Sequence, residues 1–181
     1  TTLTMAYVTW PELHIAHVGD SRCYLARDGE LRRLTRDHTL AEQLVEAHAL
    51  SPEEARRSRF RHILVNAVGG SAKSVRVDLH SFELVPGDRL LLCSDGLTGH
   101  LGDAALAEQL SQPVSAEDSA RALIDAANAA GGSDNITVVL AHFCRRQGRL
   151  GSCRRGLLPP PVPPLPVFGG GGGGSVGCVV G

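Results

Sequence analysis

The chain has 181 residues, the size of one ordinary domain, and its formal net charge is −1. Hydrophobic residues make up 43% of it and charged residues 20%, which is typical of a soluble globular protein. The near-neutral charge argues against nucleic acid as the main partner, and no apolar run approaches the length of a membrane span.

The first part of the chain is predicted to consist mainly of strands. The stretches "LTMAYVTW", "ELHIAHVG" and "RCYLARDG" favour three consecutive strands. Asp28-Gly29, between the last of these and "ELRRLT", is a strong signal for a tight hairpin turn.

Two helices with clear start signals are expected next. Thr39 followed by Glu42 is a capping-box pattern that opens a helix over residues 40–50. Ser51, Pro52 and Glu54 open a second helix, because they supply an N-cap, a proline at the first helical position and an acid at the third.

The second half of the body indicates strands, then helices, then one last strand. "SVRVDLHSFEL" alternates as a strand, "PGD" is a turn, and "RLLLCSD" is a buried strand that ends in an acid. Asp103 is expected to cap the helix "AALAEQLSQ", and Ser115 with Asp118 caps "AEDSARALIDAANAA". Gly131 ends that helix and "ITVVL" is the last strand. This order predicts an α+β layered fold more than a regular βαβ alternation.

Composition changes sharply near residue 144, so we expect a domain over residues 1–143 and a tail over residues 144–181. The tail contains six of the ten prolines, eleven of the 21 glycines, five Arg and no acid. It is predicted to be disordered, because it cannot bury enough apolar surface to offset its chain entropy. "PPPVPPLP" could serve as a polyproline II ligand for an SH3- or WW-like module, although a linker, terminal filler or out-of-frame translation is the favoured explanation.

The cysteines indicate a reducing compartment. There are five, an odd number, and none forms a C-x-x-C pair: Cys23, Cys93, Cys144, Cys153 and Cys178. This fits neither a disulfide framework nor a zinc site, and a cytoplasmic protein is therefore expected.

Three acids stand at the ends of apolar strands. Asp20 follows "LHIAHVG", Asp95 follows "RLLLCS", and Asp134 precedes "ITVVL". If neighbouring strands run antiparallel, the three carboxylates could converge at one edge, where a cation is needed to offset their repulsion. Oxygen ligands of this kind suit Mg²⁺ or Mn²⁺, ions that activate water for displacement at phosphorus. The alternative is that each Asp is a turn or capping residue.

The segments that carry these acids resemble the signature motifs of the metal-dependent protein phosphatase family, type 2C. They are "VGDSR" at 18–22, "LLLCSDGLT" at 90–98 and "GGSDNITVVL" at 131–140, with "TTLT", "LTRDHT" and "NAVGG" in support. Their order and spacing are similar to those of the bacterial branch, and the match covers residues 1–143. The resemblance implies an α-β-β-α four-layer sandwich with a metal cluster at one end of two packed sheets.

The resemblance also implies an activity and a set of site residues. The activity is hydrolysis of phosphoserine and phosphothreonine in proteins by a metal-activated water, with Mg²⁺ or Mn²⁺ as two core ions and a possible third. Asp95 and Asp134 would ligate a core metal and carry catalysis, and Asp20 with Asp95 would serve the third site. Asn135 would orient Asp134 through a hydrogen bond, a kind of support that commonly matters about 10–100-fold.

This sequence departs from the family pattern in two places. The family's "DG-x-GG" motif, whose aspartate bridges the core metals, has no counterpart, so the chain is expected to be the C-terminal part of the catalytic domain and weakly active or inactive by itself. The missing strands would then leave sheet edges and apolar faces exposed, which favours aggregation. Gly99 stands where many members carry an Asp that helps to hold the third metal.

A basic run is a candidate substrate site. Arg56, Arg57, Arg59 and Arg61 follow the second predicted helix, in a region that lies near the catalytic cleft in the family. They could attract a phosphorylated substrate, although a solvated helix face is the favoured alternative. His38 matches a family position and is assigned no catalytic role. Cys93 is not expected to be a nucleophile, because its strand is predicted to be buried.

The sequence therefore predicts part of a bacterial-type Ser/Thr phosphatase, expected to be a monomer whose substrates are phosphorylated by a Ser/Thr kinase. The alternative is a non-catalytic module of the same fold, which would bind phosphoproteins or act as a regulatory domain. A third possibility is a relative dedicated to a regulatory partner of a sigma factor. A "DG-x-GG" motif in the coding sequence upstream of Thr1 would favour the enzyme over the module.

Overall fold

The structure is a computed structural model that describes residues 1–69 and 74–144. In chain order, the elements are β1 (Leu3–Thr9), β2 (Glu12–Val18), β3 (Arg22–Arg27), β4 (Glu30–Arg33), α1 (Leu40–Glu46), α2 (Pro52–Arg57), the 3-10 helix η1 (Arg59–His62), β5 (Asp78–Glu83), β6 (Arg89–Cys93), α3 (Asp95–Thr98), α4 (Asp103–Ser111), α5 (Ala116–Ala129) and β7 (Val138–His142). The predicted Pro/Gly-rich tail lies outside the described residues, apart from Cys144.

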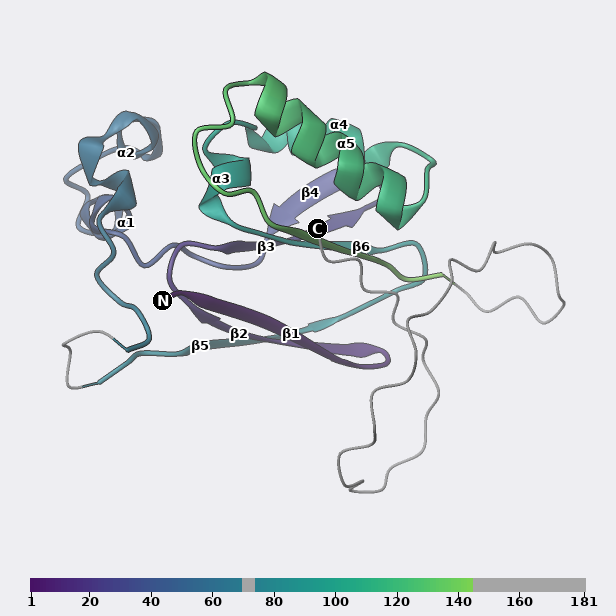
Figure 1. Cartoon of the computed structure of the whole chain (residues 1–181). Coiled ribbons are helices and arrows are strands. Elements are labelled where there is room, and N and C mark those ends of the chain that lie inside the picture. The colour runs from purple at the N-terminus through teal and green to yellow at the C-terminus, as the bar shows by residue number, and fades with distance from the viewer. Residues whose placement is uncertain (70–73, 145–181) are drawn as a thin grey trace, which may run out of the picture.

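Two antiparallel sheets form the centre of the fold. One has the strand order β1-β2-β5 and the other β4-β3-β6-β7. Figure 1 shows α4 and α5 covering the outer face of the four-stranded sheet, while α1 and α2 lie beyond one end of the sheets. The predicted α+β sandwich is confirmed, and its described part has three layers: helices, sheet and sheet.

The hairpin between β3 and β4 is closed by the predicted turn. Asp28 and Gly29 both adopt positive φ, 51° and 84°, and Arg27 pairs with Glu30 directly across the turn. Positive φ at both central residues is the backbone of the tight hairpin turns that suit strand twist. The prediction from Asp28-Gly29 is therefore confirmed.

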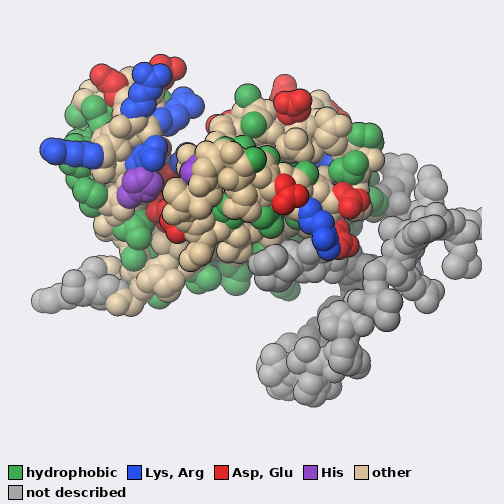
Figure 2. Space-filling view, turned by 45° about the horizontal axis from the view of Figure 1, so that its top comes forward, with side chains coloured by type: hydrophobic (Ala, Val, Ile, Leu, Met, Phe, Trp, Pro, Cys, Tyr) green, Lys and Arg blue, Asp and Glu red, His purple; other side chains and the backbone are tan. Residues whose placement is uncertain are grey.

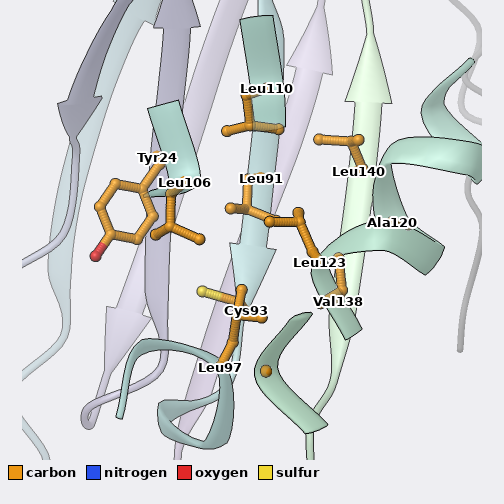
Figure 3. Close-up of a cluster of buried hydrophobic side chains, with 11 residues drawn as sticks. Tyr24, Leu91, Cys93, Leu97, Leu106, Leu110, Ala120, Leu123, Val138 and Leu140 are labelled. Carbon is orange, nitrogen blue, oxygen red and sulfur yellow. The ribbon is translucent and has the colours of Figure 1, made fainter. Parts of the chain in front are cut away.

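Two apolar layers hold the elements together. Figure 3 shows the first layer, between the four-stranded sheet and helices α3, α4 and α5, where Leu91 and Leu123 are fully buried. The second layer lies between the two sheets and is built from Leu13, Ile15, Cys23, Leu25, Leu34, Leu84 and Leu90. Because the second layer contains residues from both sheets, its packing holds the two sheets face to face.

The outer face of the three-stranded sheet is apolar and exposed. In β1 the side chains alternate, and the outward set, Leu3, Met5 and Tyr7, is 52%, 52% and 59% exposed. Leu79 on β5 is 74% exposed. Within residues 1–69 and 74–144, no helix packs on this face (Figure 1). The expectation of an exposed apolar face is thus confirmed for the described residues.

Several element boundaries differ from the predictions. Helix α1 ends at Glu46, not residue 50, because the chain turns at His48, whose φ is 55°. The predicted role of Asp103 as a cap is wrong: the N-cap of α4 is Gly102, and the Asp103 carboxylate accepts a 3.2 Å hydrogen bond from the Tyr24 hydroxyl. No helix among the described residues is long and apolar enough to cross a bilayer.

Candidate metal centre

Asp95 and Asp134 lie at the same edge of the four-stranded sheet. Strands β6 and β7 are antiparallel neighbours, with Cys93 opposite Val138, so the end of one meets the start of the other. Ser94 joins the two segments: its hydroxyl donates to the Asn135 carbonyl over 3.0 Å and accepts from the Thr137 amide over 3.0 Å. Asp95 directly follows Ser94, and Asp134 directly precedes Asn135, so these hydrogen bonds bring the two acid-bearing segments together.

The backbones on the two sides are in direct contact at Gly96. A Cβ atom at this position would lie 2.4 Å from the carbonyl oxygen of Asn135 and 3.5 Å from the carbonyl carbon of Asp134. Only glycine therefore lets the Asp95 turn approach the Asp134 loop this closely.

Replacement of Gly96 by Ala tests this close approach. We expect Gly96→Ala to lower the free energy of unfolding by about 3 kcal/mol, the upper part of the range for overpacking, because the obstructing atom belongs to the backbone. The control is Gly102→Ala, where nothing lies within 4 Å of the new Cβ and a loss of at most about 1 kcal/mol is expected for an N-cap position. Denaturant unfolding of the full-length natural protein measures both, and equal losses would contradict the prediction.

Asp20 lies at the same edge, in the connection between β2 and β3. It follows β2, and its carboxyl is about half-buried. Burial raises the pKa of Asp20 above its ordinary value, and the negative charge of Asp95 raises it further. Asp20 comes two residues before Arg22, which pairs with Cys93, and Asp95 comes two residues after Cys93, so both acids lie at the same edge of the β3–β6 pair.

Asp20 and Asp95, which are partly buried, differ from the other partly or fully buried Asp residues in having no salt bridge, whereas Asp134 is exposed. Asp37 is held by Arg22 and Arg33, Asp78 by Arg76, and Asp88 by Arg27. In the part of the chain that the structure describes, no salt bridge involves Asp20, Asp95 or Asp134. The partly buried carboxylates of Asp20 and Asp95, which have no counter-charge, fit the donor set of a hard divalent cation.

The three carboxylates do not form a complete site among themselves. Among residues 1–69 and 74–144, no group of three or more His, Cys, Asp or Glu side chains is arranged to hold a metal ion. The Asp134 carboxylate instead accepts a 2.7 Å hydrogen bond from the backbone amide of Asn135. Asp134 is thus supported by the main chain of Asn135. The sequence predicts a hydrogen bond between Asn135 and Asp134 but does not say which atom of Asn135 makes it.

Two histidines support the loops that carry the acids, and sequence reasoning missed both roles. The His38 ring accepts from the Gly19 amide, next to Asp20, over 3.1 Å. The His100 ring accepts from the Ser133 amide, next to Asp134, over 3.1 Å, and contacts the Ser133 hydroxyl over 3.0 Å. Only the "RDHT" pattern hinted at the first of these, and no sequence signal marks the second.

Known proteins with this arrangement of segments are bacterial phosphatases. The "Protein phosphatase 2C" family description matches residues 1–59. The serine/threonine protein phosphatase PstP of Mycobacterium tuberculosis is 43% identical over 141 residues, 78% of this chain and 27% of its own length. The phosphatase stp of Listeria innocua is 40% identical over 140 residues, 77% of this chain and 55% of its own length.

Solved structures agree with these relatives. The crystal structure of PstP from M. tuberculosis superposes with a TM-score of 0.75 at 42% identity, over 80% of this chain and 60% of that one. The chain belongs to the type 2C protein phosphatase family. A second structure shows the catalytic domain of PstP in complex with two manganese ions; it has a TM-score of 0.70 at 41% identity and covers 80% of this chain and 59% of that one. The chain thus spans little more than half of these phosphatase domains.

The predicted substrate arginines of this type 2C phosphatase chain lie on α2 and η1. Arg56 and Arg57 end α2, and Arg59 and Arg61 lie in η1. Figure 2 shows basic side chains gathered on the lobe formed by these elements, and Figure 1 places that lobe at the same end of the sheets as α3. Among the described residues, none of the four Arg is in a salt bridge, so their charge is available to an anionic partner.

The cysteine next to this edge is not a nucleophile. Cys93 is 4% exposed, and burial raises the pKa of its thiol to about 12. The thiolate is the reactive form, so Cys93 stays an inert thiol near neutral pH. The prediction that Cys93 is buried is confirmed.

Proposed function

We propose that this chain forms part of the catalytic domain of a Ser/Thr protein phosphatase that hydrolyses phosphoserine and phosphothreonine with Mg²⁺ or Mn²⁺. One observation supports this most directly: Asp95 and Asp134 lie at one edge of the four-stranded sheet, on segments that are joined there through Ser94, and neither carboxylate is in a salt bridge among the described residues. Such a pair is stabilised by a divalent cation.

Each acid has a defined role in the proposal. Asp95 and Asp134 hold a core ion from the two sides of the β6–β7 edge, and Asp20 with Asp95 serves a further ion. Gly99, the C-cap of α3 four residues after Asp95, leaves that further site with one oxygen donor fewer than in many members. When bound, such ions supply an activated water and stabilise negative charge that develops at phosphorus.

The remaining ligands come from outside this chain in the proposal. The acids described do not complete a site, and the chain spans only 60% of the PstP domain to which it is similar. A further acid from the part of the domain that is not spanned would bridge the core ions. The chain by itself is therefore expected to bind metal weakly and to turn over little substrate.

The partner of the site is a phosphorylated protein. The four Arg of the α2–η1 lobe lie at the same end of the sheets as α3, and guanidinium groups bind phosphate with charge-assisted hydrogen bonds (Figure 1). A Ser/Thr kinase in the cytoplasm would supply the substrates, and the phosphatase would act as a monomer in signalling. These assignments are our proposal for the natural protein.

Removal of metal tests the proposed reaction. With the full-length natural protein and a phosphothreonine peptide, EDTA should reduce phosphate release by at least about 100-fold, because both the nucleophile and charge stabilisation depend on the ions. Excess Mn²⁺ should restore it, whereas Ca²⁺, which is larger and coordinates less rigidly, should restore far less.

Two results would contradict the proposal. Turnover that resists EDTA would show that the reaction needs no exchangeable metal. Binding of the phosphopeptide without any hydrolysis at saturating Mn²⁺ would favour the non-catalytic module instead.

A further inference from the structure

The loop that carries Asp20 is held by one histidine from two directions. The His38 ring accepts a 3.1 Å hydrogen bond from the amide of Gly19, and the His38 amide donates to the Gly19 carbonyl over 2.7 Å. Both polar groups of Gly19 are therefore bonded to the same residue. Asp20 is the next residue in the chain, so the position of its backbone is set by these two bonds.

Gly19 has little freedom to move within this arrangement. Its φ is +116°, a conformation that other residues rarely adopt, and a Cβ atom there would lie 2.3 Å from the side chain of Thr2. Such a backbone persists only where the surroundings hold it, and the hydrogen bonds from His38 supply that support.

The His38 ring is itself fixed by partners distant in the sequence. Its side chain is 1% exposed, and Nε2 lies 2.9 Å from a carboxylate oxygen of Asp78, the first residue of β5. Because Nδ1 accepts from Gly19, the ring proton is on Nε2 and is donated to Asp78. The Asn66 amide also reaches Nδ1 over 2.8 Å, and Asn66 bonds both backbone groups of Arg76.

We propose that His38 is a positioning residue, which transmits the fixed orientation of Asp78 and Asn66 to Gly19 and so places the Asp20 carboxylate beside Asp95 for cation binding. This inference depends on the proposed function, because it gives the Asp20–Asp95 pair a ligand role. Residues that orient metal ligands commonly change metal affinity by about 10–100-fold when they are removed.

Two substitutions of similar polarity separate this role from a general contribution to packing. His38→Asn puts a carbonyl oxygen near the place of Nδ1 and keeps an acceptor for the Gly19 amide, but it loses the contact with Asp78. His38→Gln puts its amide near the place of Nε2 and keeps the contact with Asp78, but it leaves the Gly19 amide without an acceptor. Both variants should be made in the full-length natural protein.

The first measurement needs no metal. In EDTA-treated protein, hydrogen exchange at the Gly19 amide should become on the order of tenfold faster in His38→Gln than in the wild type, because that amide loses its hydrogen bond. His38→Asn should exchange within about threefold of the wild type. If the Gly19 amide exchanges as slowly in His38→Gln as in the wild type, or exchanges equally fast in both variants, the proposed hydrogen bond from Gly19 to the His38 ring is wrong.

The second measurement tests whether the hydrogen bonds to Gly19 affect metal binding. By calorimetric titration, the Mn²⁺ affinity of His38→Gln should fall by about tenfold or more, and that of His38→Asn by much less. If His38→Gln frees the Gly19 amide but keeps its Mn²⁺ affinity, the positioning role is wrong. That result would leave the phosphatase assignment standing, since the latter depends on Asp95, Asp134 and the need for metal.

Discussion

Loss of either acid at the β6–β7 edge should abolish turnover. In the full-length natural protein, we expect Asp95→Asn and Asp134→Asn each to lower Mn²⁺-dependent cleavage of a phosphothreonine peptide by more than about 100-fold. Even residues that only support metal ligands contribute about 10–100-fold, so a ligand should contribute more. The measurement is kcat/KM at saturating Mn²⁺, with the folded state checked by circular dichroism.

A matched control removes the same charge elsewhere. Asp125 lies exposed on α5, so Asp125→Asn should leave kcat/KM within about twofold of the wild type. Near-normal turnover in Asp95→Asn or Asp134→Asn would defeat the assignment of that acid. Equal loss in Asp125→Asn would show that net charge, and not metal ligation, is responsible.

Removal of the buried Asp88 carboxylate should be the most destabilising change at the opposite end of the sheets. Its side chain is 0% exposed and accepts three hydrogen bonds of 2.8 Å, two from Arg27 and one from the Val85 amide. We expect Asp88→Ala to lower the free energy of unfolding by about 3 kcal/mol. This is the lower part of the range for a broken buried pair, because Arg27 is 38% exposed and can be rehydrated.

An exposed ion pair provides the comparison. Arg121 donates to Glu117 over 2.8 Å one turn apart on α5, with side chains 73% and 53% exposed. Glu117→Ala should cost less than about 1 kcal/mol, since water and salt screen such pairs. Denaturant unfolding of both variants gives the two values. If Asp88→Ala costs no more than Glu117→Ala, burial of the Asp88 pair does not stabilise the fold as argued.

Local patterns were sufficient to predict most elements, because their signals lie within a few residues. The alternation in β1 and the positive-φ turn at Asp28-Gly29 are examples. The capping box at Ser51 and Glu54 formed completely, with both hydrogen bonds in place. In each case, propensity and tertiary structure favour the same conformation.

The boundaries depended on partners that the sequence does not reveal. Strand β5 was predicted to begin near residue 74 but begins at Asp78, because its partner β2 offers pairing only as far as His17. Strand β7 was predicted over residues 136–140 but spans Val138–His142, the register that β6 imposes. Alternation shows which residues can form a strand, and the neighbouring strand determines where the strand ends.

The site was predictable only in part for the same reason. That Asp95 and Asp134 share an edge follows from antiparallel order. The support from His38 depends on contacts with Gly19 and Asp78, which are 19 and 40 residues away in the chain. Such contacts leave no periodic signal, and a lone histidine in a polar stretch gives no indication that its ring is buried.

The connection between β2 and β3 has a consequence for how temperature and ions act on this protein. Asp20 lies in the connection that joins β2 of one sheet to β3 of the other, and Asp95 follows β6, the neighbour of β3. A cation shared by the two carboxylates would therefore tie the connection between the sheets to the end of β6. Because such an ion binds the folded chain and not the unfolded one, thermodynamic linkage requires that the melting temperature rise with ion concentration.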